Sequence, residues 1–98
     1  MPLSEKQSRF LRGKAHPLKP VIHVGHSGLT PAVCAEAARA LKDHELIKVR
    51  FLGAEREQRD AWVGELCTHT ASELVQRIGH VATIYKARSP LPRLVLPD

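Results

Sequence analysis

Segment 21–44 constrains the fold most, because a strand, a glycine loop and a helix follow one another in it without interruption. Residues 21–24 are mostly β-branched and are closed by Gly25, which predicts a short buried strand. Thr30 is a good N-cap residue and Pro31 suits the first position of a helix, so a helix should fill the rest of the segment. Such a helix is long enough to be a crossover, which allows a parallel strand pair.

The remaining segments carry equally local signals. Ser4 and Gln7 have the spacing of a capping box, which marks the start of a first helix. Apolar and basic side chains alternate over 46–52, which is the pattern of a half-buried strand. The further elements expected are helices over about 4–15 and 55–69, and a hairpin of strands over 74–78 and 81–86 around Gly79-His80.

These elements have the order αβαβαββ, which predicts an α+β domain with a mixed four-stranded sheet packed by helices. The chain has 98 residues, enough for one domain with one modest core. We expect this domain to span 1–88, and a proline-rich, extended and loosely held tail to span 89–98. The side chains expected in the core are Phe10, Val24, Leu41, Phe51, Trp62 and Ile84.

The net charge of +5 is concentrated near the N-terminus. Residues 1–30 hold five Lys or Arg residues against one acidic residue, Glu5. A localised positive surface suits a polyanion such as RNA, DNA or an anionic membrane. Because no apolar stretch approaches the roughly 20 residues of a membrane span, and no secretion signal precedes the domain, we expect a cytoplasmic protein without a membrane partner.

The residues that could support catalysis or metal binding form no known constellation. Cys34 and Cys67 each fall inside an expected helix without a CxxC unit, so two buried, reduced thiols are expected rather than a disulfide or a metal site. Six histidines and ten acidic residues could supply acid–base groups, but no HExxH, Walker loop or GxGxxG is present. We therefore expect no enzyme, no cofactor and no small-molecule substrate.

The loop Gly25-His26-Ser27-Gly28 precedes the helix of 31–44, where backbone N–H groups and the positive helix end can meet an anion. Glycine allows a sugar-phosphate backbone to approach closely, as in the GxxG loop of KH domains. Two glycines at this spacing also occur in ordinary turns, so the motif alone decides nothing. Nearby basic residues, expected beside the loop, favour a binding site: Arg9, Arg12, Lys14, His16, Lys19, Lys48 and Arg50.

Residues 11–21 and 24–30, which read LRGKAHPLKPV and VGHSGLT, closely resemble the signature of the CRM domain in its stand-alone bacterial form, the YhbY-like proteins. The likeness continues over 43–49, which read DHELIKV, and spans almost the whole chain. The chain departs from the residues common in that family at His23, His26 and Pro31.

The resemblance implies a fold like the C-terminal domain of bacterial translation initiation factor 3. It also implies RNA binding through the GxxG loop and nearby basic residues, in association with precursors of the large ribosomal subunit. The expected partner is therefore large-subunit ribosomal RNA or its precursor particle, and the alternative is a protein-interaction module whose basic face docks an acidic ribosome-assembly partner. The matching positions in this chain are Gly25, His26, Ser27 and Gly28 for the loop, and Arg12, Lys14 and Lys19 for the basic residues.

Overall fold

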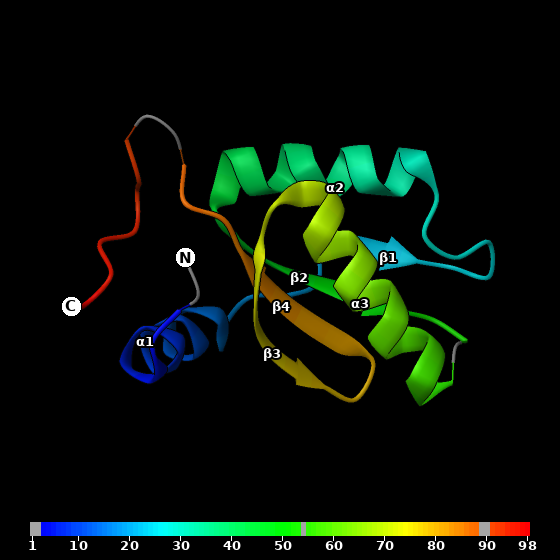
Figure 1. The fold of residues 1–98 in the computed structure, drawn as a ribbon, viewed down its shortest axis with the longest axis horizontal. Coiled ribbons are helices and arrows are strands. Elements are labelled where there is room, and N and C mark those ends of the chain that lie inside the picture. The colour runs from blue at the N-terminus through cyan, green and yellow to red at the C-terminus, as the bar shows by residue number, and fades with distance from the viewer. Residues whose placement is uncertain (1–2, 54, 89–90) are drawn as a thin grey trace.

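A computed structural model describes residues 3–53, 55–88 and 91–98. Residues 1–2 of the expected domain and 89–90 of the expected tail lie outside this described part. Figure 1 shows the three helices and four strands in the order αβαβαββ, as predicted, and every bound lies within one residue of its expected position. The elements are α1 (Glu5–Ala15), β1 (Ile22–Val24), α2 (Pro31–His44), β2 (Leu46–Phe51), α3 (Arg56–Thr70), β3 (Glu73–Ile78) and β4 (Val81–Tyr85).

The first two helices begin at side-chain caps. The Ser4 hydroxyl accepts the N–H of Gln7 at 3.1 Å, and the Gln7 side chain accepts the N–H of Ser4 at 3.1 Å, which completes the capping box of α1. At α2, Thr30 Oγ1 accepts the N–H of Val33 at 3.2 Å, and Pro31 takes the first helical position. Both starts satisfy N–H groups that would otherwise lack a helical partner.

The four strands form one mixed sheet in the order β1-β2-β4-β3, which confirms the expected architecture. β1 pairs in parallel with β2, so α2 is the crossover between them. β4 pairs antiparallel with both β2 and β3. Because β1 has three residues, it pairs only with the second half of β2, from Val49 to Phe51.

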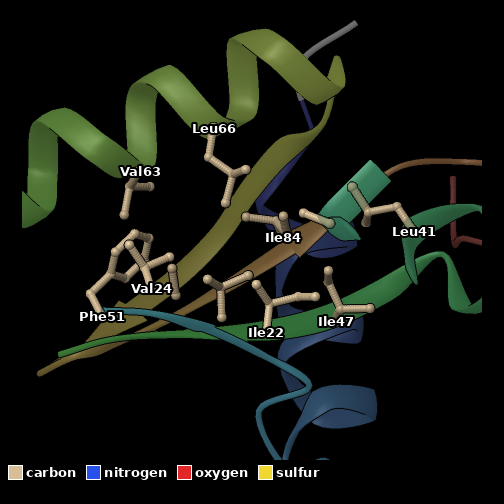
Figure 2. Close-up of a cluster of buried hydrophobic side chains, with 11 residues drawn as sticks. Ile22, Val24, Leu41, Ile47, Phe51, Val63, Leu66 and Ile84 are labelled. Carbon is tan, nitrogen blue, oxygen red and sulfur yellow. The ribbon is translucent and has the colours of Figure 1, made fainter. Parts of the chain in front are cut away.

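One face of the sheet is covered by α2 and α3, and the larger core lies between them and the strands (Figure 2). Trp62 and Phe10 are only partly buried, so the prediction that they form the core was wrong. Trp62 instead lies at the rim, where its ring stacks on Phe51 with centroids 6.4 Å apart. The other predicted core residues are confirmed as fully buried: Val24, Leu41, Phe51 and Ile84.

On the opposite face, α1 covers only one end of the sheet. Leu11 and Ala15 of α1 pack against Leu46 of β2, Val75 of β3 and Tyr85 of β4. Leu46 and Tyr85 form the first pair of the β2–β4 ladder, so α1 lies at the start of β2. In the described chain, no helix covers the rest of this face (Figure 1).

One buried carboxylate holds the C-terminal tail. Glu45 follows α2 with a φ of 63°, and it is 0% exposed. Its side chain accepts the backbone N–H groups of Arg88, Arg93 and Leu94 at 2.8, 2.6 and 2.9 Å. Residues 91–98 form no helix or strand, and Leu94 and Leu96 pack against the smaller core beneath α1.

Candidate nucleic-acid interface

The loop Gly25-His26-Ser27-Gly28 forms a tight turn at the end of β1. The N–H of Gly28 donates to the carbonyl of Gly25 at 2.9 Å, and His26 and Ser27 are exposed at the tip. Gly28 is buried with a φ of 74°, a conformation that other residues rarely adopt. A Cβ at this position would lie 2.7 Å from Cζ2 of Trp62. Glycine is therefore needed both for the turn and for the contact of the loop with α3.

The His26 ring makes a second contact between the loop and the rest of the domain. It lies against Gly53, in the connection between β2 and α3, where an added Cβ would be 2.8 Å from the ring Cε1. The N–H of Leu52 donates to the carbonyl of Val24 at 2.8 Å, which ties the same connection to the end of β1. The loop thus presents its exposed side chains from a backbone seated on two other segments.

The start of α2 offers fewer N–H donors than a helix terminus usually does. Pro31 has no N–H, and the N–H of Val33 is already donated to Thr30. The positive end of the helix dipole still faces the loop. An anion held here would therefore need side-chain donors as well, and the exposed tip of the loop carries a hydroxyl and an imidazole.

The sheet face that carries α1 is open on the side nearer the loop. Side chains alternate between the two faces of a strand. The β2 residues that alternate with Lys48 and Arg50 are buried under α2 and α3, so Lys48 and Arg50 lie on the opposite face, which carries α1. Arg50 and its partner in β1, His23, are both exposed. We call this region the open sheet face and define it by His23, Lys48, Arg50, Gln76, Ile78, Val81 and Thr83.

No residue of the open sheet face is acidic, and none is Phe, Tyr or Trp. A hollow of about 250 Å³ lies in it, and its lining combines polar with apolar residues: Lys48, Gln76 and Thr83 with Pro20, Ile78 and Val81. Proteins that hold single strands by stacking need aromatic side chains on such a face. This face is instead suited to contacts with phosphate and sugar groups.

The helix α1 does not lie beside the loop. It packs at Leu46, at the start of β2, whereas the loop follows Val24, which pairs with Phe51 at the end of that strand. At about 3.3 Å per residue, the two ends of β2 are about 16 Å apart. Figure 1 shows α1 and the β1–α2 loop at opposite ends of the sheet. The expectation that the basic residues of α1 lie beside the loop was therefore wrong.

The basic residues of α1 form a separate part of the surface. Arg9, Lys14 and His16 are exposed, so all three are accessible to a ligand. Arg12 is partly buried and forms an ion pair with Glu5 at 3.1 Å. Part of the Arg12 charge is thus already neutralised within the helix.

The remaining predicted cations lie between α1 and the loop. Lys19 is exposed in the segment that leads from α1 to β1. Lys48 Nζ donates to the carbonyl of Leu18 at 3.1 Å, which holds the ammonium group beside that segment. Together with Arg50, these residues extend the positive surface across the sheet, so the cations follow a line and do not encircle the loop.

The start of α3 does not extend the positive surface. Arg56 and Arg59 are accompanied there by three acidic residues, Glu55, Glu57 and Asp60. Arg59 Nη1 lies 3.0 Å from His80 Nδ1, and Asp60 is paired with Arg77 at 2.7 Å. The charges of this region are therefore balanced, in contrast to those of the open sheet face.

Sequence reasoning missed Gly53, Trp62 and His23 as parts of this site. The contacts of Gly53 and Trp62 with the loop join segments far apart in the sequence, so no local pattern predicts them. His23 had a usable signal, because it alternates with the buried Ile22 and Val24 and must face the other way.

The described residues also include possible metal ligands, helices and two cysteines. No group of three or more His, Cys, Asp or Glu side chains among them could hold a metal ion, and none of their helices is long and apolar enough to cross a membrane. Cys34 and Cys67 are free and partly buried. Burial raises the pKa of the Cys67 thiol. A hydrogen bond with Ser72 opposes this rise, and the charge of Glu73 adds to it. Cys67 is therefore not activated as a nucleophile.

Known proteins resemble this chain over nearly its whole length. A relative from Pseudomonas aeruginosa, named "Probable RNA-binding protein PA4753", is 47% identical over 92 residues, which cover 94% of this chain and 88% of the relative. One from Haemophilus influenzae, named "RNA-binding protein", is 44% identical over 95 residues, covering 93% of this chain and 96% of the relative. The solution structure of the hypothetical protein SAV1595 from Staphylococcus aureus superposes with a TM-score of 0.83 at 33% identity and covers 97% of this chain and 99% of that one. The pattern of one family matches residues 3–86, and the chain belongs to that family, the CRS1 / YhbY (CRM) domain.

Proposed function

We propose that the protein binds structured RNA through its sugar-phosphate backbone, with the loop of 25–28 and the open sheet face as the contact surface. The observation that carries the proposal is the projection of Lys48 and Arg50 from a sheet face without acidic residues, at the side nearer the loop. Two relatives whose names describe them as RNA-binding proteins support RNA as the polyanion.

The parts of this surface have different roles in the proposal. Gly25, where an added Cβ would meet no atom within 4 Å, leaves space for a phosphate group to approach the backbone. His26 and Ser27 donate hydrogen bonds to that phosphate. Arg50 and Lys48 neutralise further phosphates along the strand direction, which fixes the RNA on the sheet without reading its bases.

The basic residues of α1 contact a more distant part of the same RNA. Arg9, Lys14, His16 and Lys19 are exposed, and Arg12 joins them when its ion pair with Glu5 opens. An RNA that reaches from the loop to α1 must span about 16 Å along the sheet. A folded or double-stranded RNA holds its phosphates at fixed positions over that length, which favours recognition of the shape of the RNA.

We propose large-subunit ribosomal RNA, or its precursor particle, as the natural partner, and assembly of that subunit as the role. This step is supported by the resemblance of the loop and of residues 11–21 to the stand-alone bacterial CRM proteins. Crosslinking in cells followed by sequencing of the bound RNA tests it. Enrichment of large-subunit ribosomal RNA is expected, and recovery of no RNA, or of unrelated transcripts only, would contradict it.

A titration in vitro tests RNA binding itself. Folded fragments of large-subunit ribosomal RNA should bind at about 50 mM salt, and the affinity should fall steeply as salt increases because counterions are released from the phosphates. If no fragment binds at the lower salt, the RNA proposal fails. The protein-interaction alternative, in which the basic face docks an acidic ribosome-assembly partner, then becomes the better account of the charge.

A further inference from the structure

A groove whose aliphatic lining is not explained by the proposed RNA contacts lies where α1, the segment 16–21 and the end of α2 meet. Its volume is about 420 Å³, within the range of about 300–1,000 Å³ typical of ligand sites. It exists because β1 pairs only with the second half of β2, which leaves the start of β2 without a neighbouring strand on that side. Five aliphatic residues line it: Leu18, Val21, Leu46, Ile47 and Leu94.

The aliphatic lining reaches the surface. Leu18 is 40% exposed and Val21 is 49% exposed, whereas Leu46 and Ile47 beneath them are almost fully buried. Contiguous exposed apolar side chains mark contact sites for apolar groups more often than for phosphates, which need hydrogen-bond donors. This lining is therefore not explained by RNA binding.

The charged residues that line the groove, Lys14 and Lys19, are both basic. Lys14, Lys19 and His44 complete its lining, which includes no Asp or Glu. The Lys14 ammonium lies 5.6 Å from the centroid of the Phe10 ring, a cation–π contact that favours this position. Lys48 Nζ, bonded to the carbonyl of Leu18 at 3.1 Å, adds another positive charge beside the groove.

We propose that this groove docks a protein partner through a short extended segment that combines aliphatic and acidic side chains. The aliphatic side chains of the segment would bury Leu18 and Val21, and its carboxylates would pair with Lys14 and Lys19. Charge complementarity and the aliphatic lining together select this occupant, because an RNA strand satisfies the lysines but leaves the aliphatic side chains exposed. The proposal does not depend on RNA binding at the open sheet face.

The test begins with selection from a library of random ten-residue peptides on the immobilised full-length protein. Sequences that combine Leu, Ile or Val with Asp or Glu are expected to be enriched. An enriched peptide, synthesised with a fluorophore, is then titrated by anisotropy against the protein and its variants. The double variant Leu18→Ser/Val21→Ser should bind it at least about tenfold more weakly, as expected for the loss of central anchors.

Matched variants separate the groove from general effects. Ile78 is an aliphatic residue of the open sheet face that is 66% exposed. The variant Ile78→Ser should leave the peptide affinity unchanged. Lys14→Gln/Lys19→Gln should weaken peptide binding and reduce its salt dependence. The Leu18→Ser/Val21→Ser variant should retain its affinity for ribosomal RNA fragments, and circular dichroism should show that each variant remains folded.

Three results would overturn the proposal. They are a selection without enriched aliphatic and acidic sequences, peptide binding that survives Leu18→Ser/Val21→Ser, and peptide binding lost equally in Ile78→Ser. If RNA binding fails but the peptide results hold, the groove proposal stands and the RNA proposal falls. If RNA affinity drops in Leu18→Ser/Val21→Ser while the peptide does not bind, the groove belongs to the RNA surface.

Discussion

The backbone of Gly28 lies so close to Trp62 that a methyl group on residue 28 would be 2.7 Å from the indole Cζ2. Trp62 in turn stacks on Phe51, which is 1% exposed at the end of β2. The loop is therefore joined to the core by one partly buried indole ring. A substitution at Gly28 should therefore lower the stability of the domain as well as alter its surface.

Replacement of Gly28 by alanine should lower the free energy of unfolding by at least about 2 kcal/mol, because a positive φ and a steric clash both act against the new methyl group. Urea denaturation followed by tryptophan fluorescence measures the change. Gly25→Ala is the matched control, since it has no positive φ and no atom within 4 Å of the added Cβ. Equal destabilisation by the two substitutions would show that the contact with Trp62 is unimportant.

Glu45→Ala should destabilise the domain by about 3 kcal/mol or more, because three backbone N–H groups lose a charged acceptor. Hydrogen exchange should show faster exchange at Arg93 and Leu94 in particular. Glu36→Ala, at an exposed position of α2, is the control and should change stability by less than about 0.5 kcal/mol. Unchanged exchange in the tail of the Glu45 variant would contradict its role as the holding group.

Arg50→Gln should weaken RNA binding most at low salt and reduce the slope of log K against log salt by about 0.7–0.9, the value for one phosphate contact. Filter binding over a series of salt concentrations measures the slope. Arg39→Gln removes an equal charge from an exposed position of α2, which covers the other face of the sheet. The same decrease in both variants would indicate a general charge effect with no contact at Arg50.

Alkaline pH should destabilise the protein through Tyr85. Burial, and to a lesser degree the charge of Glu45, raises the pKa of the phenol above its ordinary value of 10.0. The unfolded chain therefore ionises first, so the contribution of Tyr85 to stability is complete below pH 10 and is lost as the pH rises through the folded pKa. Urea midpoints should fall as the pH rises above 10, and should fall less in Tyr85→Phe, on this linkage argument. An equal fall of the urea midpoint with pH in the unchanged protein and in Tyr85→Phe would refute this role of Tyr85.

The elements of this fold could be predicted because each begins or ends at a local chemical signal. The capping box at Ser4, the Thr30-Pro31 pair and the alternation along β2 act within a few residues of the chain. The position of α1 could not be predicted, because the path of 16–21 depends on which sheet face buries Leu11 and Ala15.

The site was predictable only in part for the same reason. Lys48 and Arg50 follow from the period of a strand, so their common face could be read from the sequence. The contact between Gly28 and Trp62 depends on packing of distant segments, and the indole was assigned to the core by its helical arc. Glu45 gave no sign of its role, since an acidic residue after a helix is usually a solvated one.

The two ends of the described chain pack together at the side away from the loop. Leu3 and Leu96 both contact the small core beneath α1, and Figure 1 shows α1 and the red C-terminal residues at that end of the molecule. A fluorophore or a fused domain attached at either terminus would therefore leave the loop unobstructed. Distances from such a label to a labelled RNA could then report which way along the sheet the RNA runs.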